Sequence, residues 1–312
     1  MLQAHLTTPK KAHARSTGDF QTADAAVAVA DALDTNHRSS LGAVPVQYPV
    51  QSRHLDGSKL CFTVDDVLSS AECERLIAVS EAEGYGQALV NVGGGRQILN
   101  NDVRKSSRCI IDSNEAVAIL WSRLKPLIPA RDGWVPVGLN ARLRFLRYAP
   151  GDYFAPHHDG CYMHMSAEPS GEIVQGDMSR CTLMLYLNTP ARGGATNFLS
   201  PRDETQRTSV EPRTGLGLVF DHQIYHEGAP LEAGVKYAIR TDVMFRRVAA
   251  GSTAASVVNE SSAIAEGAQL LERAHDAPSS ATGAATEMVG GESERSELEG
   301  RFTSCVAKLD LT

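Results

Sequence analysis

Hydrophobic residues recur at helical spacing in two segments of the first half of the chain. The first predicted helix starts at Ser69, whose pairing with Glu72 three residues later is typical of a capping box, and it ends at Gly84. Its apolar face consists of Cys73, Leu76, Ile77 and Ser80. The second predicted helix spans residues 114–127, where prolines end it. Its apolar stripe consists of Ala118, Trp121 and Leu124.

Short β-like runs replace the helical pattern after Gly133, and glycine and proline residues separate them. One further run, residues 60–64, precedes the first helix. The later runs cover residues 143–148, 181–187, 216–220 and 237–245. Helices followed by many short strands predict a mainly β (α+β) fold, in which N-terminal helices pack on a β-sandwich or jelly roll.

The two ends of the chain lack strong periodicity. Residues 1–56 are predicted to form a disordered tail, although residues 25–33 have the spacing of a short helix with a face made mostly of alanine. Residues 249–312 are rich in Ser, Ala, Gly and Glu and are predicted to form a low-complexity tail with a short helix over 262–275. The predicted domain therefore spans residues 57–248.

Composition narrows the class of partner and the compartment. The 312 residues carry a formal net charge of −7 without a basic stripe, which argues against a nucleic-acid partner. The chain has no run of 18 apolar residues and no secretory h-region, so we expect no membrane partner and a cytoplasmic location, with the nucleus as the alternative. The six cysteines form no C-x-x-C pair and are expected to be reduced thiols.

His157 and Asp159 are the first residues that suggest chemistry, because they are two positions apart after an extended run. Alternate residues of a strand point to the same face, so one imidazole and one carboxylate can reach a single metal ion. A lone H-x-D pattern is weak evidence, since a neighbouring histidine and aspartate often form only a surface contact.

A third candidate ligand, His226, follows an apolar run that is typical of a strand. Two histidines and one carboxylate on one face of an octahedral ion leave positions open for a cosubstrate and O₂, as in non-haem Fe(II) oxygenases. The alternative is that His226 is a partly buried histidine satisfied by hydrogen bonds. His222 precedes it at helical spacing, but the apolar neighbours favour a strand.

Lys236 and Arg240 share one face of the next predicted strand. A cation inside an apolar barrel is unfavourable unless an anion pairs with it, and a dicarboxylate cosubstrate would supply that anion. The alternative is a solvated edge strand whose charges protect against aggregation. The polar and positive segment 96–108 has two interpretations as well: it borders a substrate cleft, or it is a solvated loop, which is slightly favoured.

Four short patterns, taken in order, resemble the 2-oxoglutarate/Fe(II)-dependent dioxygenase superfamily, and within it the prolyl 4-hydroxylase-like catalytic domain. They are Y-x-x-G followed by P-H-x-D, the strand end Y-L-N at 186–188, G-G-x-T-x-F at 193–198, and H-x-G followed by G-x-K. The resemblance runs from about residue 62 to residue 247. It implies a double-stranded β-helix of the cupin-like jelly-roll type.

The resemblance also implies a site and a reaction. It assigns the iron ligands to His157, Asp159 and His226. It assigns the residues that hold 2-oxoglutarate to Tyr148, Tyr186, Thr196 and Lys236. It implies Fe(II), 2-oxoglutarate, O₂ and L-ascorbate as cofactors of a dioxygenase, an oxidoreductase that hydroxylates an unactivated C–H bond and converts 2-oxoglutarate to succinate. Peptidyl-proline is the leading substrate by resemblance.

Two departures from the collagen-type enzymes leave alternatives open. Tyr237 follows the lysine where those enzymes usually have tryptophan, and either Lys236 or Arg240 can hold the distal carboxylate of 2-oxoglutarate. The substrate can also be a small molecule or another side chain. Outside oxygenase chemistry, the alternatives are a metal cupin that uses zinc or manganese and a binding module without activity.

Overall fold

The computed structural model describes residues 23–39, 42–49, 59–92, 96–167 and 173–248. The helices in these ranges are α1 Ala23–Asp31, α2 Ser70–Glu83, α3 Asn114–Leu124 and the 3-10 helix η1 Lys125–Leu127. The strands are β1 Ala43–Pro45, β2 Cys61–Val64, β3 Gly86–Gln87, β4 Val90–Asn91, β5 Gln97–Ile98, β6 Arg104–Lys105, β7 Ser107–Asp112, β8 Trp134–Leu139, β9 Arg142–Tyr148, β10 Tyr153–His157, β11 Met163–Ala167, β12 Ile173–Tyr186, β13 Arg192–Gly193, β14 Thr196–Ser200, β15 Asp203–Val210, β16 Gly217–Asp221, β17 His226–Gly228, β18 Leu231–Ala233 and β19 Lys236–Arg247.

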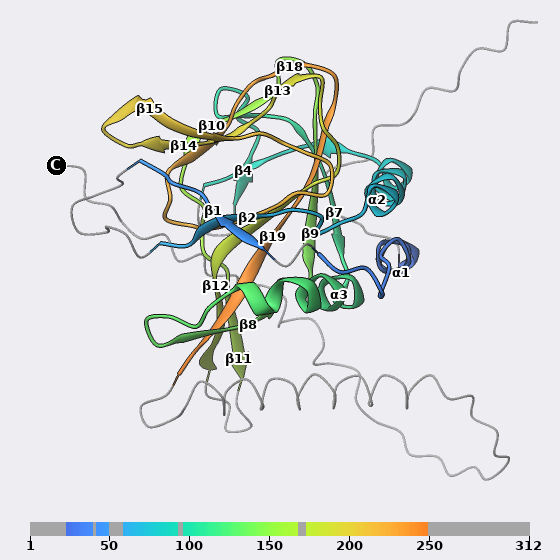
Figure 1. Cartoon of the computed structure of the whole chain (residues 1–312), viewed down its shortest axis with the longest axis vertical. Helices are drawn as coiled ribbons and strands as arrows, with labels where there is room; N and C mark the ends of the chain where they lie inside the picture. Colours follow the sequence, from blue (N-terminus) through green and yellow to red (C-terminus); the bar gives the residue numbers. More distant parts are fainter. Residues whose placement is uncertain (1–22, 40–41, 50–58, 93–95, 168–172, 249–312) are drawn as a thin grey trace, which may run out of the picture.

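Two antiparallel sheets face each other and form the body of the molecule (Figure 1). The larger sheet has the order β1-β2-β16-β12-β19-β9-β7-β3, and the smaller sheet has the order β15-β14-β17-β10-β6. The chain passes repeatedly from one sheet to the other, with β9, β12, β16 and β19 in the larger sheet and β10, β14, β15 and β17 in the smaller one. This alternation is that of a double-stranded β-helix, so the predicted jelly roll is confirmed.

Two apolar layers result from the alternation of side chains along the central strands. On β12, Leu183 and Leu185 belong to the core between the larger sheet and the helices, whereas Met184 and Tyr186 belong to the core between the two sheets. Because both faces of β12 are covered, its sequence is a continuous apolar run rather than an alternating one.

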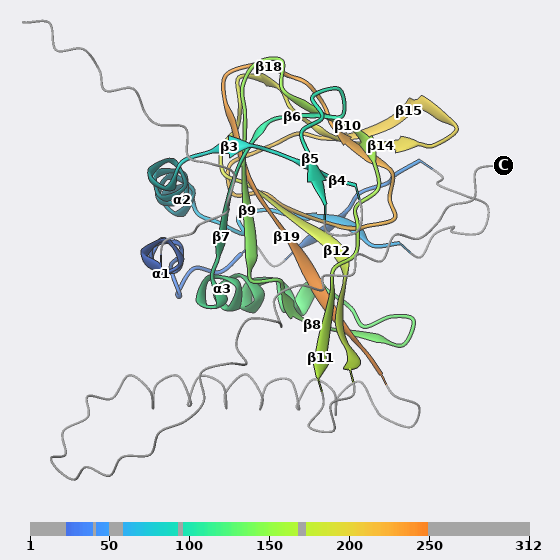
Figure 2. The same cartoon turned by 180° about the vertical axis from the view of Figure 1, so that it is seen from behind.

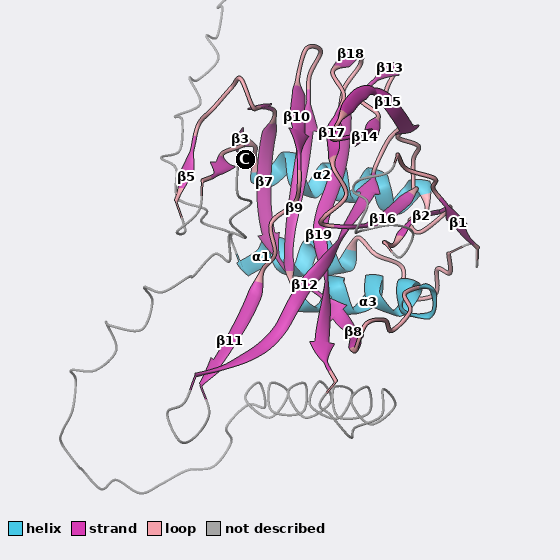
Figure 3. Cartoon of the chain, turned by 90° about the vertical axis from the view of Figure 1, so that its left-hand side faces the viewer, coloured by secondary structure: helices cyan, strands magenta, loops and turns pink. Residues whose placement is uncertain are grey.

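The three helices cover the outer face of the larger sheet (Figure 2; Figure 3). Helix α2 begins and ends as predicted, with a complete capping box between Ser69 and Glu72 and a C-cap at Gly84, whose φ is 92°. Helix α3 forms where the second helix was predicted, but Ala118 is exposed and the buried stripe differs from the predicted one. Its buried residues are Ala116, Val117, Leu120, Arg123 and Leu124.

Helix α1 lies in the region that was predicted to be a disordered tail of residues 1–56, so this prediction is wrong for the described residues there. Its apolar residues pack in the core that the other helices share with the larger sheet, and they are Ala25, Val29, Ala32 and Leu33. The small alanine side chains form a weak apolar face, but tertiary packing stabilises the helix. The predicted tail 249–312, with its helix over 262–275, lies outside the described residues, and the domain division as a whole stays a prediction.

A buried ion pair joins the three helices. Arg123 Nη2 on α3 lies 2.6 Å from Glu72 Oε1 on α2, and both side chains are almost completely buried. Arg123 Nη2 also donates to the carbonyl oxygen of Asp34, just after α1, at 2.7 Å. Burial alone would raise the pKa of Glu72, but Arg123 and two backbone N–H groups lower it to about 2. The pair therefore fixes the helical layer in one arrangement.

None of the helices in the described ranges has the length and apolarity that crossing a bilayer requires. The cysteines in these ranges are free and comprise Cys61, Cys73, Cys109, Cys161 and Cys181. Cys73 and Cys181 are buried, as expected for small apolar side chains in a core.

We predict that Glu72→Gln lowers the free energy of unfolding by about 3–5 kcal/mol, because it leaves the Arg123 guanidinium buried without a carboxylate. The matched control is Asp65→Asn, which removes one partner of an exposed ion pair with Arg213 and is expected to change stability by less than about 1 kcal/mol. Urea unfolding of both variants measures the difference. Equal effects would contradict the role given to the buried pair.

Candidate metal and cosubstrate site

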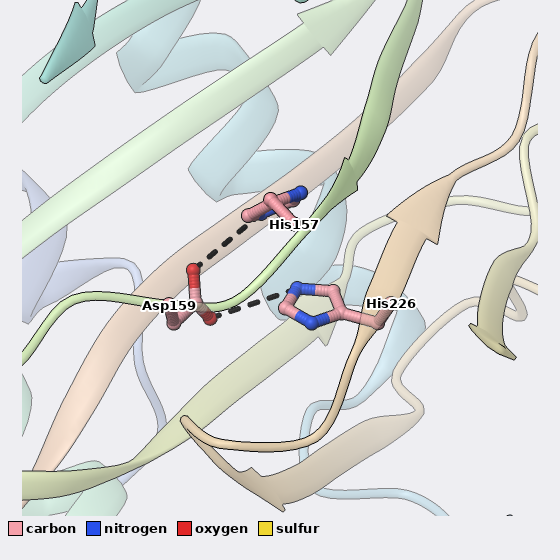
Figure 4. Close-up of side chains that lie close together, drawn as sticks. All are labelled: His157, Asp159 and His226. Atoms are coloured by element: carbon pink, nitrogen blue, oxygen red, sulfur yellow. Dashed lines mark ion pairs between the residues drawn. The ribbon is translucent and has the colours of Figure 1, made fainter. Parts of the chain in front are cut away.

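His157, Asp159 and His226 converge on one point between the two sheets (Figure 4). The nearest oxygen and nitrogen atoms of Asp159 and His157 are 3.6 Å apart, and those of Asp159 and His226 are 3.7 Å apart. One ligand atom from each of the three residues lies within 4.8 Å of the other two. The structure therefore brings together the three residues that the sequence proposed as ligands.

The register of two neighbouring strands produces this convergence. In the antiparallel pair β10–β17, His157 lies directly opposite His226. On its other side β17 pairs with β14, where Phe198 lies opposite His226. Asp159 follows the end of β10, and its backbone N–H donates to the carbonyl oxygen of His222 at 3.0 Å. Strand pairing thus fixes both imidazoles, and the backbone bond to the turn after β16 fixes the carboxylate.

The hydrogen bonds of the two imidazoles leave the same nitrogen atom free on each ring. Nδ1 of His157 lies 2.8 Å from the carbonyl oxygen of Ala155, and Nδ1 of His226 lies 2.8 Å from that of Ile224. A carbonyl oxygen only accepts, so Nδ1 carries the proton and the Nε2 lone pairs point toward Asp159. Burial and the neighbouring His157 lower the pKa of His226 to about 3, which keeps that imidazole neutral.

Asp159 is held as a carboxylate although it is buried. Burial alone would raise its pKa, but Arg240 and the two histidines hold the pKa well below its usual range. Arg240 Nη2 lies 3.0 Å from Asp159 Oδ1, and the hydroxyl of Thr182 donates to Oδ2. Two side chains therefore hold the carboxylate of Asp159 in place, and it is ionised at neutral pH.

Arg240 forms ion pairs with two carboxylates of the protein. Besides Asp159, it contacts Asp242 at 3.3 Å, and Asp242 also pairs with Arg144 at 3.2 Å and with His222 at 3.6 Å. Burial would raise the pKa of Asp242, but these cations lower it. Asp242 thus supports Arg240, which in turn contacts a candidate metal ligand.

Lys236 differs from Arg240 because it has no carboxylate partner among the described residues. It is 2% exposed, and its ammonium group donates to the carbonyl oxygen of Gly194. The ammonium lies 5.1 Å from the ring centre of Tyr148 and 5.3 Å from that of Tyr186. Burial lowers the pKa of Lys236 to about 8, so the group is still a cation at neutral pH. The predicted solvated edge-strand alternative is wrong, since β19 lies between β12 and β9.

The G-G-x-T-x-F pattern at residues 193–198 contacts both Lys236 and Tyr186. Gly194 has a φ of 78°, and a Cβ there would lie 3.1 Å from Cδ of Lys236, so the lysine stem needs glycine at this position. The hydroxyls of Thr196 and Tyr186 are 2.7 Å apart and share a hydrogen bond. The structure thus brings Tyr148, Tyr186, Thr196 and Lys236 together in one cluster of side chains.

The donor set fits a divalent transition metal. Two neutral imidazoles and one carboxylate are the ligands of non-haem Fe(II) oxygenases, and they leave coordination positions open. The three side chains are also held in place, because both Nδ1 atoms are satisfied by carbonyl groups and the carboxylate contacts Thr182 and Arg240.

Arg104 is a residue of the site that the sequence analysis did not single out. The segment 96–108 was slightly favoured as a solvated loop, yet Arg104 is only 9% exposed. Its guanidinium lies 4.7 Å from the ring centre of Phe154, which stacks on His157 with ring centres 3.7 Å apart. Only the pairing of β6 with β10 reveals this position, which no local pattern indicates.

Comparison with known proteins gives a family match for the core of the domain. Residues 143–241 match the family model of the 2OG-Fe(II) oxygenase superfamily. The chain is 26% identical to prolyl 4-hydroxylase 1 of Arabidopsis thaliana over 196 residues, which cover 55% of this chain and 64% of that protein. The match therefore spans less than two thirds of the length of that relative.

Similar solved structures include two prolyl hydroxylases. The viral collagen prolyl hydroxylase of Paramecium bursaria Chlorella virus-1, in a 2OG complex, is 22% identical with a TM-score of 0.39, covering 60% of this chain and 97% of that chain. The prolyl hydroxylase of Trichoplax adhaerens, in complex with a hypoxia-inducible-factor peptide fragment, is 17% identical with a TM-score of 0.42, covering 59% and 82%.

We predict that the metal-free protein loses stability as the pH falls below about 6.5, in part because the folded state resists protonation of His226. The unfolded chain takes up this proton near pH 6.5, whereas the folded chain does so only near pH 3, so the unfolded state binds more protons in between. Between pH 7.5 and pH 5, protonation of this histidine in the unfolded state lowers the free energy of unfolding by ~2 kcal/mol. In urea unfolding, the free energy of unfolding of His226→Gln should fall less over that interval than that of the wild type. An equal fall in both proteins would refute the lowered pKa of His226.

Proposed function

The chain belongs to the 2OG-Fe(II) oxygenase superfamily through residues 143–241, and we propose that it is an Fe(II)- and 2-oxoglutarate-dependent dioxygenase that hydroxylates an unactivated C–H bond, in the manner of prolyl 4-hydroxylases. The observation that carries this proposal is the pairing of two features in one apolar layer. A cluster of two histidines and one aspartate suits a ferrous ion, and a buried lysine without a carboxylate partner suits a dicarboxylate.

In this proposal His157, Asp159 and His226 hold the metal ion through two Nε2 atoms and one carboxylate. When bound, Fe(II) supplies the reduction of O₂ that splits 2-oxoglutarate into succinate and CO₂ and places one oxygen atom into the substrate C–H bond. The protein supplies a neutral imidazole at His226, whose pKa lies far below neutral pH, and a carboxylate that Arg240 keeps ionised.

Lys236 receives the distal carboxylate of 2-oxoglutarate in this proposal. The ammonium group is protonated at neutral pH, and it contacts two aromatic rings and one carbonyl group. A bound carboxylate would form an ion pair with it and so compensate for its burial. Thr196 and Tyr186 place hydroxyl groups next to it. Arg240 is the weaker candidate for this role, because Asp159 and Asp242 already occupy its guanidinium.

Aromatic side chains pack against both histidines of the cluster. Phe220 packs edge-on against His226 with ring centres 4.6 Å apart, and Phe154 covers one face of His157. A dry site strengthens the electrostatic contacts and suppresses side reactions. Peptidyl-proline is the substrate class that we propose from the likeness to prolyl 4-hydroxylases, and we expect L-ascorbate to sustain turnover.

We predict that His157→Ala and Asp159→Ala each reduce succinate release on the order of 100-fold or more while the protein stays folded, because each removes a metal ligand. The matched control is His158→Ala, which removes the exposed neighbouring histidine outside the cluster and should leave activity close to that of the wild type. The assay measures succinate by mass spectrometry with Fe(II) and 2-oxoglutarate present. Full activity in either ligand variant would refute the oxygenase, and stoichiometric metal binding without succinate would favour a binding module.

Lys236→Gln is expected to weaken 2-oxoglutarate binding by about 10–100-fold, because it removes a charge-assisted hydrogen bond. Lys236→Arg keeps the positive charge and should retain part of the affinity. Affinity is measured anaerobically at saturating Mn(II), so that loss of the metal does not affect the result. If Arg240 holds the distal carboxylate instead, Arg240→Gln will weaken 2-oxoglutarate binding more than Lys236→Gln does.

A further inference from the structure

Arg104 is a second buried cation of the site without an anionic partner. It lies on β6, the edge strand of the smaller sheet, where the register sets it opposite Phe154 of β10. The next residue, Lys105, points to solvent, with 54% of its side chain exposed. Since successive residues of a strand point to opposite faces, Arg104 faces the space between the sheets.

The contacts of Arg104 connect it to the candidate metal cluster. Its guanidinium lies over the ring of Phe154 at 4.7 Å, and that ring is stacked on His157. Its Nε donates to the hydroxyl of Ser106 at 3.0 Å. No carboxylate among the described residues forms an ion pair with it. The side chains in contact with Arg104 are those of Ser106, Phe154 and Tyr148, which are neutral, and the carboxylate of Asp159 acts on it only from beyond ion-pair distance.

The other cations near the cluster have anionic partners, either in the protein or in the proposed function. Arg144 and Arg240 pair with Asp242, and Arg240 also pairs with Asp159. In the proposed function, Lys236 pairs with the distal carboxylate of 2-oxoglutarate. A divalent metal ion and a dicarboxylate cancel each other's charge, so loading the site with both leaves Arg104 still without a counter-ion.

Burial lowers the pKa of Arg104, and the positive charge of Arg240 lowers it further, whereas Tyr148 and Asp159 raise it. The guanidinium groups of Arg104 and Arg240 thus repel each other, and Arg104 is buried. An anion that enters next to Arg104 would relieve this repulsion and would replace the missing solvation.

We propose that Arg104 binds a carboxylate of the substrate, and that the enzyme acts on carboxylate-bearing compounds, either a free amino acid or a peptide with an acidic side chain beside the hydroxylated residue. This inference rests on the proposed function, because it names the substrate class of the same site. The planar guanidinium presents two parallel N–H donors that match a carboxylate. The stack of Phe154 on His157 places this anchor beside the metal ligands, where it orients a C–H bond for attack.

The test compares acids with their neutral counterparts. Succinate release and hydroxylated product are measured for free L-amino acids, for the corresponding amides, and for capped proline peptides that carry either Glu or Gln beside the proline. The free amino acids and the Glu peptides distinguish the two sources of the carboxylate. The proteins are the wild type, Arg104→Gln, Arg104→Lys, and the control Lys105→Gln from the exposed face of the same strand.

We expect the wild type to prefer a carboxylate-bearing compound over its neutral counterpart by about 10–100-fold in kcat/KM. Arg104→Gln should lose this preference, Arg104→Lys should keep part of it, and Lys105→Gln should keep it all. The affinity for 2-oxoglutarate, measured anaerobically with Mn(II), should be the same in all four proteins. That measurement also shows whether Arg104→Gln has kept an intact cosubstrate site.

Three results would overturn this inference while leaving the proposed function intact. The first is equal use of acids and neutral counterparts by the wild type. The second is a loss of 2-oxoglutarate affinity in Arg104→Gln that is as large as its loss of kcat/KM for the carboxylate-bearing substrate. That result would mean that Arg104 binds the cosubstrate. The third is uncoupled succinate release that no carboxylate-bearing compound increases. If the wild type neither binds 2-oxoglutarate nor releases succinate, the proposed function itself fails, and this inference fails with it.

Discussion

The pairing of β10 with β17 is the constraint on which the rest of the site depends, because it sets His157 opposite His226 across two hydrogen-bonded strands. A shift of this register by one residue would turn one imidazole to the other face of the sheet and separate the cluster. β14 pairs with the far side of β17 and β6 with the far side of β10, so neither strand can slide without breaking a second ladder. The same ladder places Arg104 beside the cluster.

The buried charged residues fall into two sets, those that form ion pairs with one another and those that do not. Asp159 and Asp242 neutralise Arg240 and Arg144, and this network keeps the aspartate of the cluster ionised and oriented. Lys236 and Arg104 lie outside the network, and neither forms an ion pair with a carboxylate of the described residues. Because a buried cation without an ion-pair partner is unfavourable, the proposed function assigns an anion to Lys236 and the further inference assigns one to Arg104. In these proposals, the fold combines a structural ion network with two cations that bind anionic ligands.

Local patterns in the sequence were sufficient for the features that depend on neighbouring residues. The capping box of α2 and the shared face of Lys236 and Arg240 are such features, and both are present in the structure. Features that depend on distant partners were missed, because periodicity carries no information on which strands pair. The helical spacing of residues 25–33 was recognised, but the packing of this helix in the core was not, and Arg104 faces the site because β6 pairs with β10. The partners of Arg240 likewise emerged only from three-dimensional proximity.

In the proposed function, one molecule of 2-oxoglutarate contacts both the metal ion held by the histidine–aspartate cluster and the ammonium group of Lys236. Anaerobic calorimetric titration of 2-oxoglutarate into the protein, with and without Mn(II), tests this most directly. If the metal ion and Lys236 hold the same molecule, the metal must strengthen 2-oxoglutarate binding, and 2-oxoglutarate must strengthen metal binding by the same factor. We expect measurable binding only when Mn(II) is present. Equal affinity with and without the metal ion would contradict the account.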